Sequence, residues 1–138
     1  EDEIRLGGPA EHVEARILRW LRTQARMIFA EDLQFYCTEA GTDLPKLAVG
    51  DARRRWGSCS GRQSIRLNWR LVMAPPLVRR SVVAHEVAHL RHMDHSRRFY
   101  ALLDQIYESD RRVADRWLKD HGRGLHMVGV ERQPLPAD

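Results

Sequence analysis

Hydrophobic side chains recur every three or four residues along the first third of the chain. The apolar positions that share one side are Val13, Ile17, Leu18, Leu21, Ala25, Ile28 and Phe29. The arginines on the opposite side are Arg16, Arg19, Arg22 and Arg26. This spacing predicts one long amphipathic helix over residues 10–40. We expect Gly41 to end it, because glycine readily adopts the left-handed conformation of a helix terminus.

The middle of the chain changes to a period of two. Residues 47–49 begin a strand, whereas residues 57–61 are rich in glycine and serine and predict a turn. In the next segment the apolar positions are Ile65, Leu67, Trp69 and Leu71, and the polar ones are Arg66, Asn68 and Arg70. The alternation predicts a half-buried strand over residues 64–71, paired with the preceding strand as an antiparallel hairpin.

Three helices are predicted after this strand. The pair Pro75-Pro76 ends the strand and opens a helix that runs to about Met93, since proline is tolerated in a first helical turn. Two more helices follow over residues 96–107 and 110–121, and the glycines at 122 and 124 are expected to loosen the chain into a tail. The elements together predict an α+β fold with a long N-terminal helix, a small antiparallel sheet and C-terminal helices.

Length and composition limit the class of protein. A chain of 138 residues is long enough for one core, so we expect a single domain over residues 1–138, with 1–9 and 123–138 flexible or peripheral. No run of eighteen apolar residues occurs, which predicts no membrane span. Cys37 and Cys59 do not have the spacing of a zinc clip, and two cysteines form no disulfide framework. Free thiols favour a cytoplasmic location.

The net charge of +4 comes almost wholly from arginine, with 21 Arg against 2 Lys. Arginine matches phosphate oxygens, so a nucleic acid or a nucleotide is one possible partner. A genome rich in G and C explains the same bias without any partner. The 19 acidic residues are interspersed with the basic ones, which is not typical of a dedicated nucleic-acid-binding protein. Nothing in the sequence predicts an oligomeric state.

The segment from residue 85 to residue 95 carries the clearest chemistry. On a helix, His85 and His89 are one turn apart and face the same side, as two ligands of one zinc ion must. Glu86 lies beside the first ligand, where a carboxylate reaches a metal-bound water without binding the metal. The flanking residues are small and apolar, which predicts a buried helix whose polar groups need a partner such as a metal ion.

A third ligand must come from nearby, and three residues compete for the role. His92 lies about 10 Å along a continuous helix from His85, which is too far for one zinc ion. His95 reaches the site if the helix ends and the chain folds back, with Ser96 as the N-cap of the next helix. Glu108, on a following helix, is the alternative ligand. We favour His95, because residues 94–96 look like a junction between two helices. The site would then have three histidines and an open fourth position, as a catalytic zinc site does.

Several motifs together resemble the YgjP-like metallopeptidase family and, more distantly, the SprT-like proteases. The matching segments are residues 55–59 (RWGSC), 65–71 (IRLNWRL), 82–90 (VVAHEVAHL), 95–96 (HS) and 99–100 (FY). The resemblance implies a minimal zincin-like fold with His85, His89 and His95 as zinc ligands. It also implies that Glu86 is the catalytic acid and base. Asp94 departs from the family, which usually has asparagine there; it would add negative charge near the metal or cap the turn.

The working hypothesis is a zinc-dependent peptidase. Zinc would lower the pKa of its bound water to about 7, and Glu86 would accept the proton as that water attacks a peptide carbonyl. The strand over residues 64–71 would offer an edge on which an extended protein or peptide substrate is added. Tyr100, Asn68 and Arg70 are the candidates for contacting the substrate or the oxyanion.

Two other functions use the same metal site. In a metal-dependent nucleoside triphosphate pyrophosphatase, arginines would hold the phosphates. The candidate arginines are Arg53, Arg54, Arg55, Arg66 and Arg70. A protease that acts on proteins bound to nucleic acid is the second alternative. An adaptor with a purely structural zinc is disfavoured by the open coordination position and by the glutamate next to a ligand.

Overall fold

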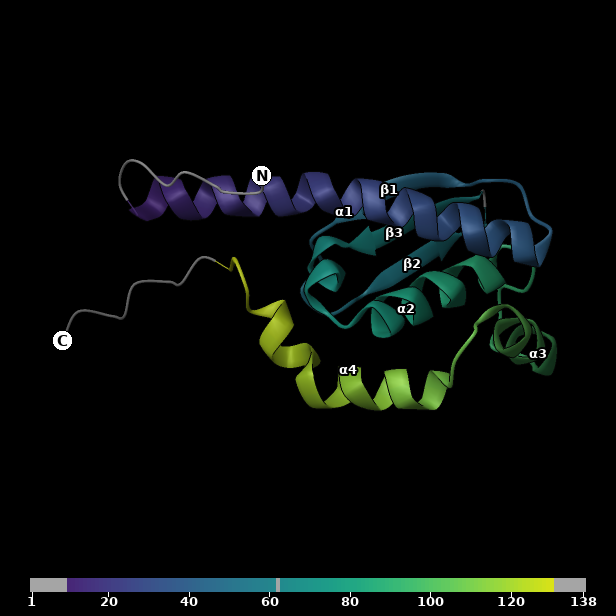
Figure 1. The fold of residues 1–138 in the computed structure, drawn as a ribbon. Coiled ribbons are helices and arrows are strands. Elements are labelled where there is room, and N and C mark those ends of the chain that lie inside the picture. Colours follow the sequence, from purple (N-terminus) through teal and green to yellow (C-terminus); the bar gives the residue numbers. More distant parts are fainter. Residues whose placement is uncertain (1–9, 62, 131–138) are drawn as a thin grey trace.

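The computed structural model describes residues 10–61 and 63–130, and it confirms an α+β fold consistent with a minimal zincin-like domain. The elements are α1 (Ala10–Ala40), β1 (Lys46–Gly50), β2 (Gly57–Ser60), β3 (Ser64–Asn68), the 3-10 helix η1 (Trp69–Met73), α2 (Pro76–His89), α3 (Arg97–Ile106) and α4 (Arg111–His126). In Figure 1, α1 runs along one side of the sheet, and α2 lies between the sheet and α4. The expectations for residues 1–9 and 131–138 lie outside the described residues.

The ends of the helices follow the local signals in part. The first helix ends where expected, and Gly41 has a φ of +68°. The helix α2 ends at His89, earlier than the expected Met93. The expectation of a loose tail from Gly122 was wrong, because α4 continues through both glycines to His126. A Cβ at Gly122 would lie 3.2 Å from the Trp56 ring, so this glycine lets the helix pack closely instead of ending it.

The three strands form a mixed sheet in the order β1-β3-β2. The expected antiparallel pairing of the strand at 47–49 with the strand at 64–71 was wrong, because β1 pairs with β3 in parallel. The segment predicted as a turn forms β2, which pairs with β3 in antiparallel register, with Ser58 opposite Arg66. The long predicted strand also ends early, at Asn68, where the chain turns into η1.

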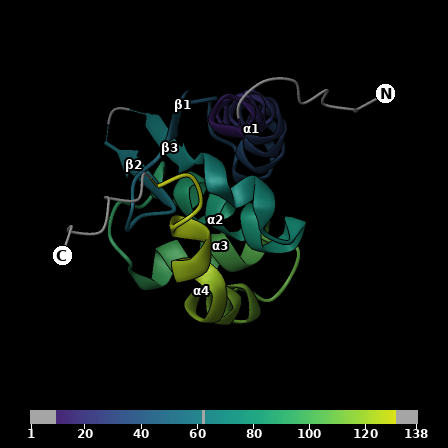
Figure 2. The same ribbon diagram turned by 90° about the vertical axis from the view of Figure 1, so that its left-hand side faces the viewer.

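One face of the sheet carries the core. Ile65 and Leu67 of β3 are fully buried against the helices, whereas Arg66 between them is exposed. The end-on view in Figure 2 shows the helices gathered on one side of the sheet. The face with Ile65 and Leu67 is called the inner face below, and the face with Arg66 the outer face. None of the described helices is long and apolar enough to cross a membrane.

Candidate active site

Three histidines converge where α2 ends and the chain returns to begin α3. His89 Nε2 lies 3.1 Å from His95 Nε2, which lies 3.4 Å from His85 Nε2. Two nitrogens that bind one tetrahedral zinc at about 2.0–2.1 Å are roughly 3.3 Å apart, so these separations suit a shared ion. Within the described part of the chain, these are the residues whose ligand atoms gather closely enough to hold a metal.

Local structure explains how His95 reaches the other two histidines. After His89, the Leu90 amide donates to the Val87 carbonyl at 2.9 Å, which closes the helix and lets the chain reverse. Ser96 caps α3, as the sequence predicts, by accepting a hydrogen bond from the Phe99 amide at 3.3 Å. The Phe99 ring then packs against all three imidazoles, with ring centroids 4.4–5.0 Å apart. The three histidines are thus held together by the turn after α2, by the Ser96 cap and by the Phe99 ring.

The protonation state of His85 and His89 favours metal binding, because both imidazoles are neutral near pH 7. His89 Nδ1 donates to the His92 carbonyl oxygen at 3.0 Å, which leaves the Nε2 lone pair free for a ligand bond. Burial, with smaller contributions from the neighbouring imidazoles, lowers the pKa of His85 to about 4. Burial also lowers the pKa of His89. The imidazoles of His85 and His89 are therefore neutral near pH 7, which is the form that binds metals.

Glu86 is buried beside the cluster and touches the sheet through a glycine. Only 6% of its surface is exposed, and burial raises the pKa of its carboxyl group to about 7. A Cβ at Gly57 of β2 would lie 2.9 Å from Glu86 Cγ and 3.1 Å from Oε2. This role of Gly57 was not predicted from the sequence. Its signal is a glycine inside a strand, which often marks the close approach of another group.

Two clefts meet at His85 and Glu86. One, of about 300 Å³, is bounded by the three histidines and by β2. The other, of about 250 Å³, extends on the far side of Glu86 and is lined in part by Tyr100 and Arg111. The Tyr100 ring is stacked 6.1 Å from the His95 ring, and the Arg111 guanidinium lies 4.6 Å from the Tyr100 centroid. Tyr100, a candidate contact from the sequence, therefore lies next to the histidine cluster.

Among the strands that the structure describes, β2 is an edge strand, and its open side faces the larger cleft. Because the Asn68 amide donates to the Trp56 carbonyl, the alternating pattern of an antiparallel pair directs the backbone groups of Gly57 and Cys59 away from β3. Cys59 also lines this cleft as a half-buried free thiol, and burial together with the charge of Glu86 raises its pKa to about 11. The edge thus offers unpaired backbone donors and acceptors beside Glu86.

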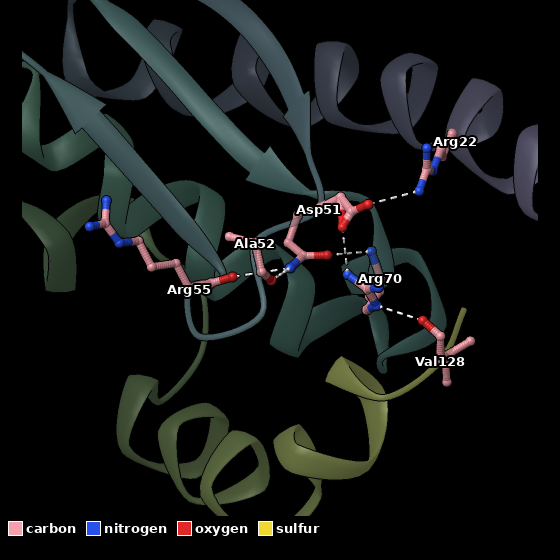
Figure 3. Close-up of polar contacts among 7 residues, drawn as sticks. Arg22, Asp51, Ala52, Arg55, Arg70 and Val128 are labelled. Carbon is pink, nitrogen blue, oxygen red and sulfur yellow. Dashed lines mark hydrogen bonds and ion pairs between the residues drawn. The ribbon is translucent and has the colours of Figure 1, made fainter. Parts of the chain in front are cut away.

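Asn68 fastens the loop that leads into β2. Its Nδ2 donates to the carbonyl oxygens of Ala52 at 2.7 Å and Arg55 at 3.1 Å. Its Oδ1 accepts a hydrogen bond from the Arg70 amide at 3.0 Å. Figure 3 shows these contacts converging on the loop. The side chain lies on the same strand face as Arg66, as the alternation predicts, but it is only 2% exposed because the loop covers it.

Arg70 completes the same fastening from η1. It is also 2% exposed, and its Nε donates to the Val128 carbonyl at 2.9 Å. Its Nη1 lies 3.4 Å from Asp51 Oδ1, while Arg22 of α1 bonds the other carboxylate oxygen at 3.0 Å (Figure 3). Asn68 and Arg70, both expected as substrate or oxyanion contacts, therefore use their polar atoms within the protein to hold the loop of residues 51–55.

Other candidates from the sequence lie apart from the cluster. Glu108, the alternative ligand, accepts a hydrogen bond from the Tyr36 hydroxyl and pairs with Arg80 at 2.6 Å. His92 is not among the clustered ligand atoms, but its carbonyl oxygen accepts the hydrogen bond from His89 Nδ1. The five arginines considered as a phosphate site do not form one surface, because Arg70 is buried whereas the other four are exposed.

Comparison with known proteins adds one match. The family model described as the YgjP-like metallopeptidase domain matches residues 3–121, a range that includes the histidine cluster, Glu86 and β2. No curated protein and no solved structure matches the chain. Since the family model covers most of the sequence, the implied activity is metal-dependent hydrolysis. The chain belongs to the YgjP-like metallopeptidase family.

Proposed function

We propose that the protein is a zinc-dependent peptidase in which His85, His89 and His95 bind the ion and Glu86 is the general base. The observation that carries this proposal is the convergence of three imidazole Nε2 atoms beside a buried carboxyl group. Three imidazoles suit zinc and leave the fourth tetrahedral position open. A bound zinc would supply a water with a pKa of about 7 and polarise the scissile carbonyl.

The protein's own groups then move the protons. Glu86 accepts a proton from the attacking water and donates it to the amine that leaves. Burial brings its pKa close to neutrality, which suits a group that must both accept and donate near pH 7. Tyr100 is the proposed donor to the oxyanion, because it lines the cleft with His85 and Glu86.

A peptide substrate is proposed to bind along β2. Strand addition needs an unpaired edge, and β3 is the central strand with partners on both sides. The proposed substrate-binding edge is therefore β2 and not the strand over residues 64–71 that the sequence suggested. On β2, Gly57 and Cys59 direct backbone groups toward the cleft. An extended chain paired there would carry its carbonyl groups past Glu86. The free thiols of Cys37 and Cys59 support a cytoplasmic location for this activity.

Glu86→Gln tests the proposal. We expect kcat for an unstructured protein substrate to fall by about 10²–10⁴-fold, because proton transfer is lost. Zinc content, measured by elemental analysis, should stay equal to that of the wild type. Nucleoside triphosphates are assayed in parallel with the same two proteins. Hydrolysis of triphosphates without hydrolysis of protein would favour the pyrophosphatase, and equal activity of both proteins would contradict a catalytic role for Glu86.

A further inference from the structure

A third concavity lies beside the metal cleft, on the outer face of the sheet. It has a volume of about 170 Å³, and its lining includes Gly50, Arg55, Trp56, Ser58, Arg66 and Asn68. We infer that this outer pocket binds the carboxylate of an aspartate or glutamate in the substrate, so that the enzyme prefers acidic peptides. The inference rests on the proposed peptidase function and names its substrate class.

Arg66 is held in place by a glycine on the neighbouring strand. A Cβ at Gly50 would lie 2.9 Å from Arg66 Cγ and 3.0 Å from Cδ, so the arginine stem lies directly on the Gly50 backbone. Arg66 Nη1 is 3.5 Å from the same point, which keeps the guanidinium near the pocket wall. The stem of this long side chain therefore packs against the backbone, which restricts its conformations and lowers the entropic cost of binding a ligand.

Arg55 joins the outer pocket to the metal cleft, since it lines both. Its carbonyl oxygen accepts a hydrogen bond from Asn68 Nδ2 at 3.1 Å. In Figure 3 its side chain extends away from the group formed by Arg22, Asp51 and Arg70. The backbone of Arg55 is therefore fastened, while its guanidinium is exposed at the junction of the two concavities.

Among the described residues, the charge of the outer pocket has no acidic partner. No aspartate or glutamate is among the described residues that line it. Asp51, the acid of the adjacent loop, is engaged by Arg22 and Arg70. Neither Arg55 nor Arg66 forms an ion pair with any acid that the structure describes. Two guanidinium groups at one small concavity suit a carboxylate, which each can bind with a pair of parallel hydrogen bonds.

The strand β2 relates the pocket to the scissile bond. Gly57 and Cys59 face α2 on the inner side, whereas Ser58 lies opposite Arg66 on the outer side. A peptide paired with β2 alternates its side chains in the same way. Side chains adjacent to those at the metal cleft therefore point to the outer face, within reach of the two arginines. A triphosphate is less favoured, because Arg70 is buried and bonded elsewhere and adds no third guanidinium to the two that line the pocket.

The test uses two fluorogenic peptides that differ only in Glu or Gln at one position, with the position scanned on both sides of the cleaved bond. We expect kcat/KM of the wild type to be about five- to tenfold higher for Glu at one position. Arg55→Gln and Arg66→Gln should each bring this ratio close to one. Arg53→Gln is the matched control, because Arg53 is an exposed arginine of the same loop that does not line the outer pocket. Its ratio should equal that of the wild type.

Binding separates this inference from the peptidase proposal. The same peptides are titrated against Glu86→Gln by fluorescence anisotropy, where we expect the Glu peptide to bind about five- to tenfold more tightly. Cleavage or binding of both peptides without any preference for Glu would overturn the inference while leaving the peptidase intact. A nucleoside triphosphate that binds in competition with the Gln peptide, and loses this effect in Arg66→Gln, would assign the pocket to phosphate and also overturn it.

Discussion

The two walls of the active-site cleft are built in different ways. The helix wall is α2 with the turn to α3, and its histidines lie within one short segment, from His85 to His95. The strand wall is β2 with the loop of residues 51–55, and contacts between distant parts of the chain hold it. The bond from Arg70 to the Val128 carbonyl, for example, joins residues 58 positions apart. The proposed chemistry is therefore encoded locally, whereas the proposed substrate edge depends on the completed fold.

The walls also differ in charge. On the helix wall, burial lowers the pKa of His85 to about 4 and raises that of Glu86 to about 7, which favours uncharged forms until a cation is present. On the strand wall, Arg55 carries permanent charge, and so does Arg66 of the neighbouring strand β3. The helix wall would become positively charged only when a metal ion binds. The strand wall is positively charged with or without the ion. The two walls can thus be disturbed separately.

The largest effect is expected from His95→Ala, which breaks the helix wall. Loss of a ligand should lower zinc affinity by more than about 100-fold, since disturbing even an outer-shell partner costs roughly 10–100-fold. Peptidase activity should be lost with the metal. Titration with a competing chelator measures the affinity. Glu108→Gln is the matched control and should retain zinc, because Glu108 is engaged by Tyr36 and Arg80. Zinc loss in the Glu108 variant alone would contradict this ligand set.

The sequence predicted the helix wall well, because its signals are local. The spacing of His85 and His89 places them on one helical face, and Ser96 marks the start of α3 in the sequence as in the structure. The long first helix and its end at Gly41 follow from periodicity and from one glycine. These features need only the geometry of a few neighbouring residues, and a single sequence contains that information.

The strand wall was predicted poorly for a physical reason. The residues of β2, Gly-Ser-Cys-Ser, have low strand propensity, and they form a strand because β3 pairs with them. The alternation that continues to Leu71 hides the change from β3 to η1, so Arg70 was assigned to a polar strand face although it is buried in η1. Asn68 does share the face of Arg66, but the alternation does not show that a loop buries it. Their partners lie far away in the sequence, and no local pattern identifies them.

Gly57→Ala tests the point where the two walls touch. The added Cβ would lie 2.9 Å from Glu86 Cγ, so we expect the Glu86 side chain to be displaced from its present position. Displacement of a catalytic group by about 1 Å can cost about 100-fold, so we expect kcat to fall roughly 10- to 100-fold with unchanged zinc content. Steady-state kinetics and elemental analysis measure the two effects.

Gly61→Ala is the matched control for this variant. A Cβ at Gly61 meets no atom within 4 Å, so kcat should equal that of the wild type. Equal kcat values for the two alanine variants would mean that contact with β2 does not position Glu86. A loss of zinc in Gly57→Ala would instead indicate that the strand wall supports the ligands as well as the carboxylate.

A smaller effect is expected from Asn68→Asp, which disturbs the strand wall alone. The carboxylate can still accept the hydrogen bond from the Arg70 amide, but it cannot donate to the carbonyl groups of Ala52 and Arg55. Two partly buried acceptors lose their donor, so the free energy of unfolding should fall by about 1–3 kcal/mol. We expect kcat/KM to fall roughly three- to tenfold as β2 loosens, with zinc content unchanged.

Two measurements show whether this loss is confined to the strand wall. Hydrogen exchange should become faster at the amides of residues 51–60 and stay unchanged at those of α2, because local opening follows the lost contacts. Arg22→Gln is the control, since it removes a half-exposed ion pair to the same loop and should change stability by less than about 1 kcal/mol. Faster exchange in α2 as well would mean that the walls are coupled, because a loop with no link to the helix cannot loosen it.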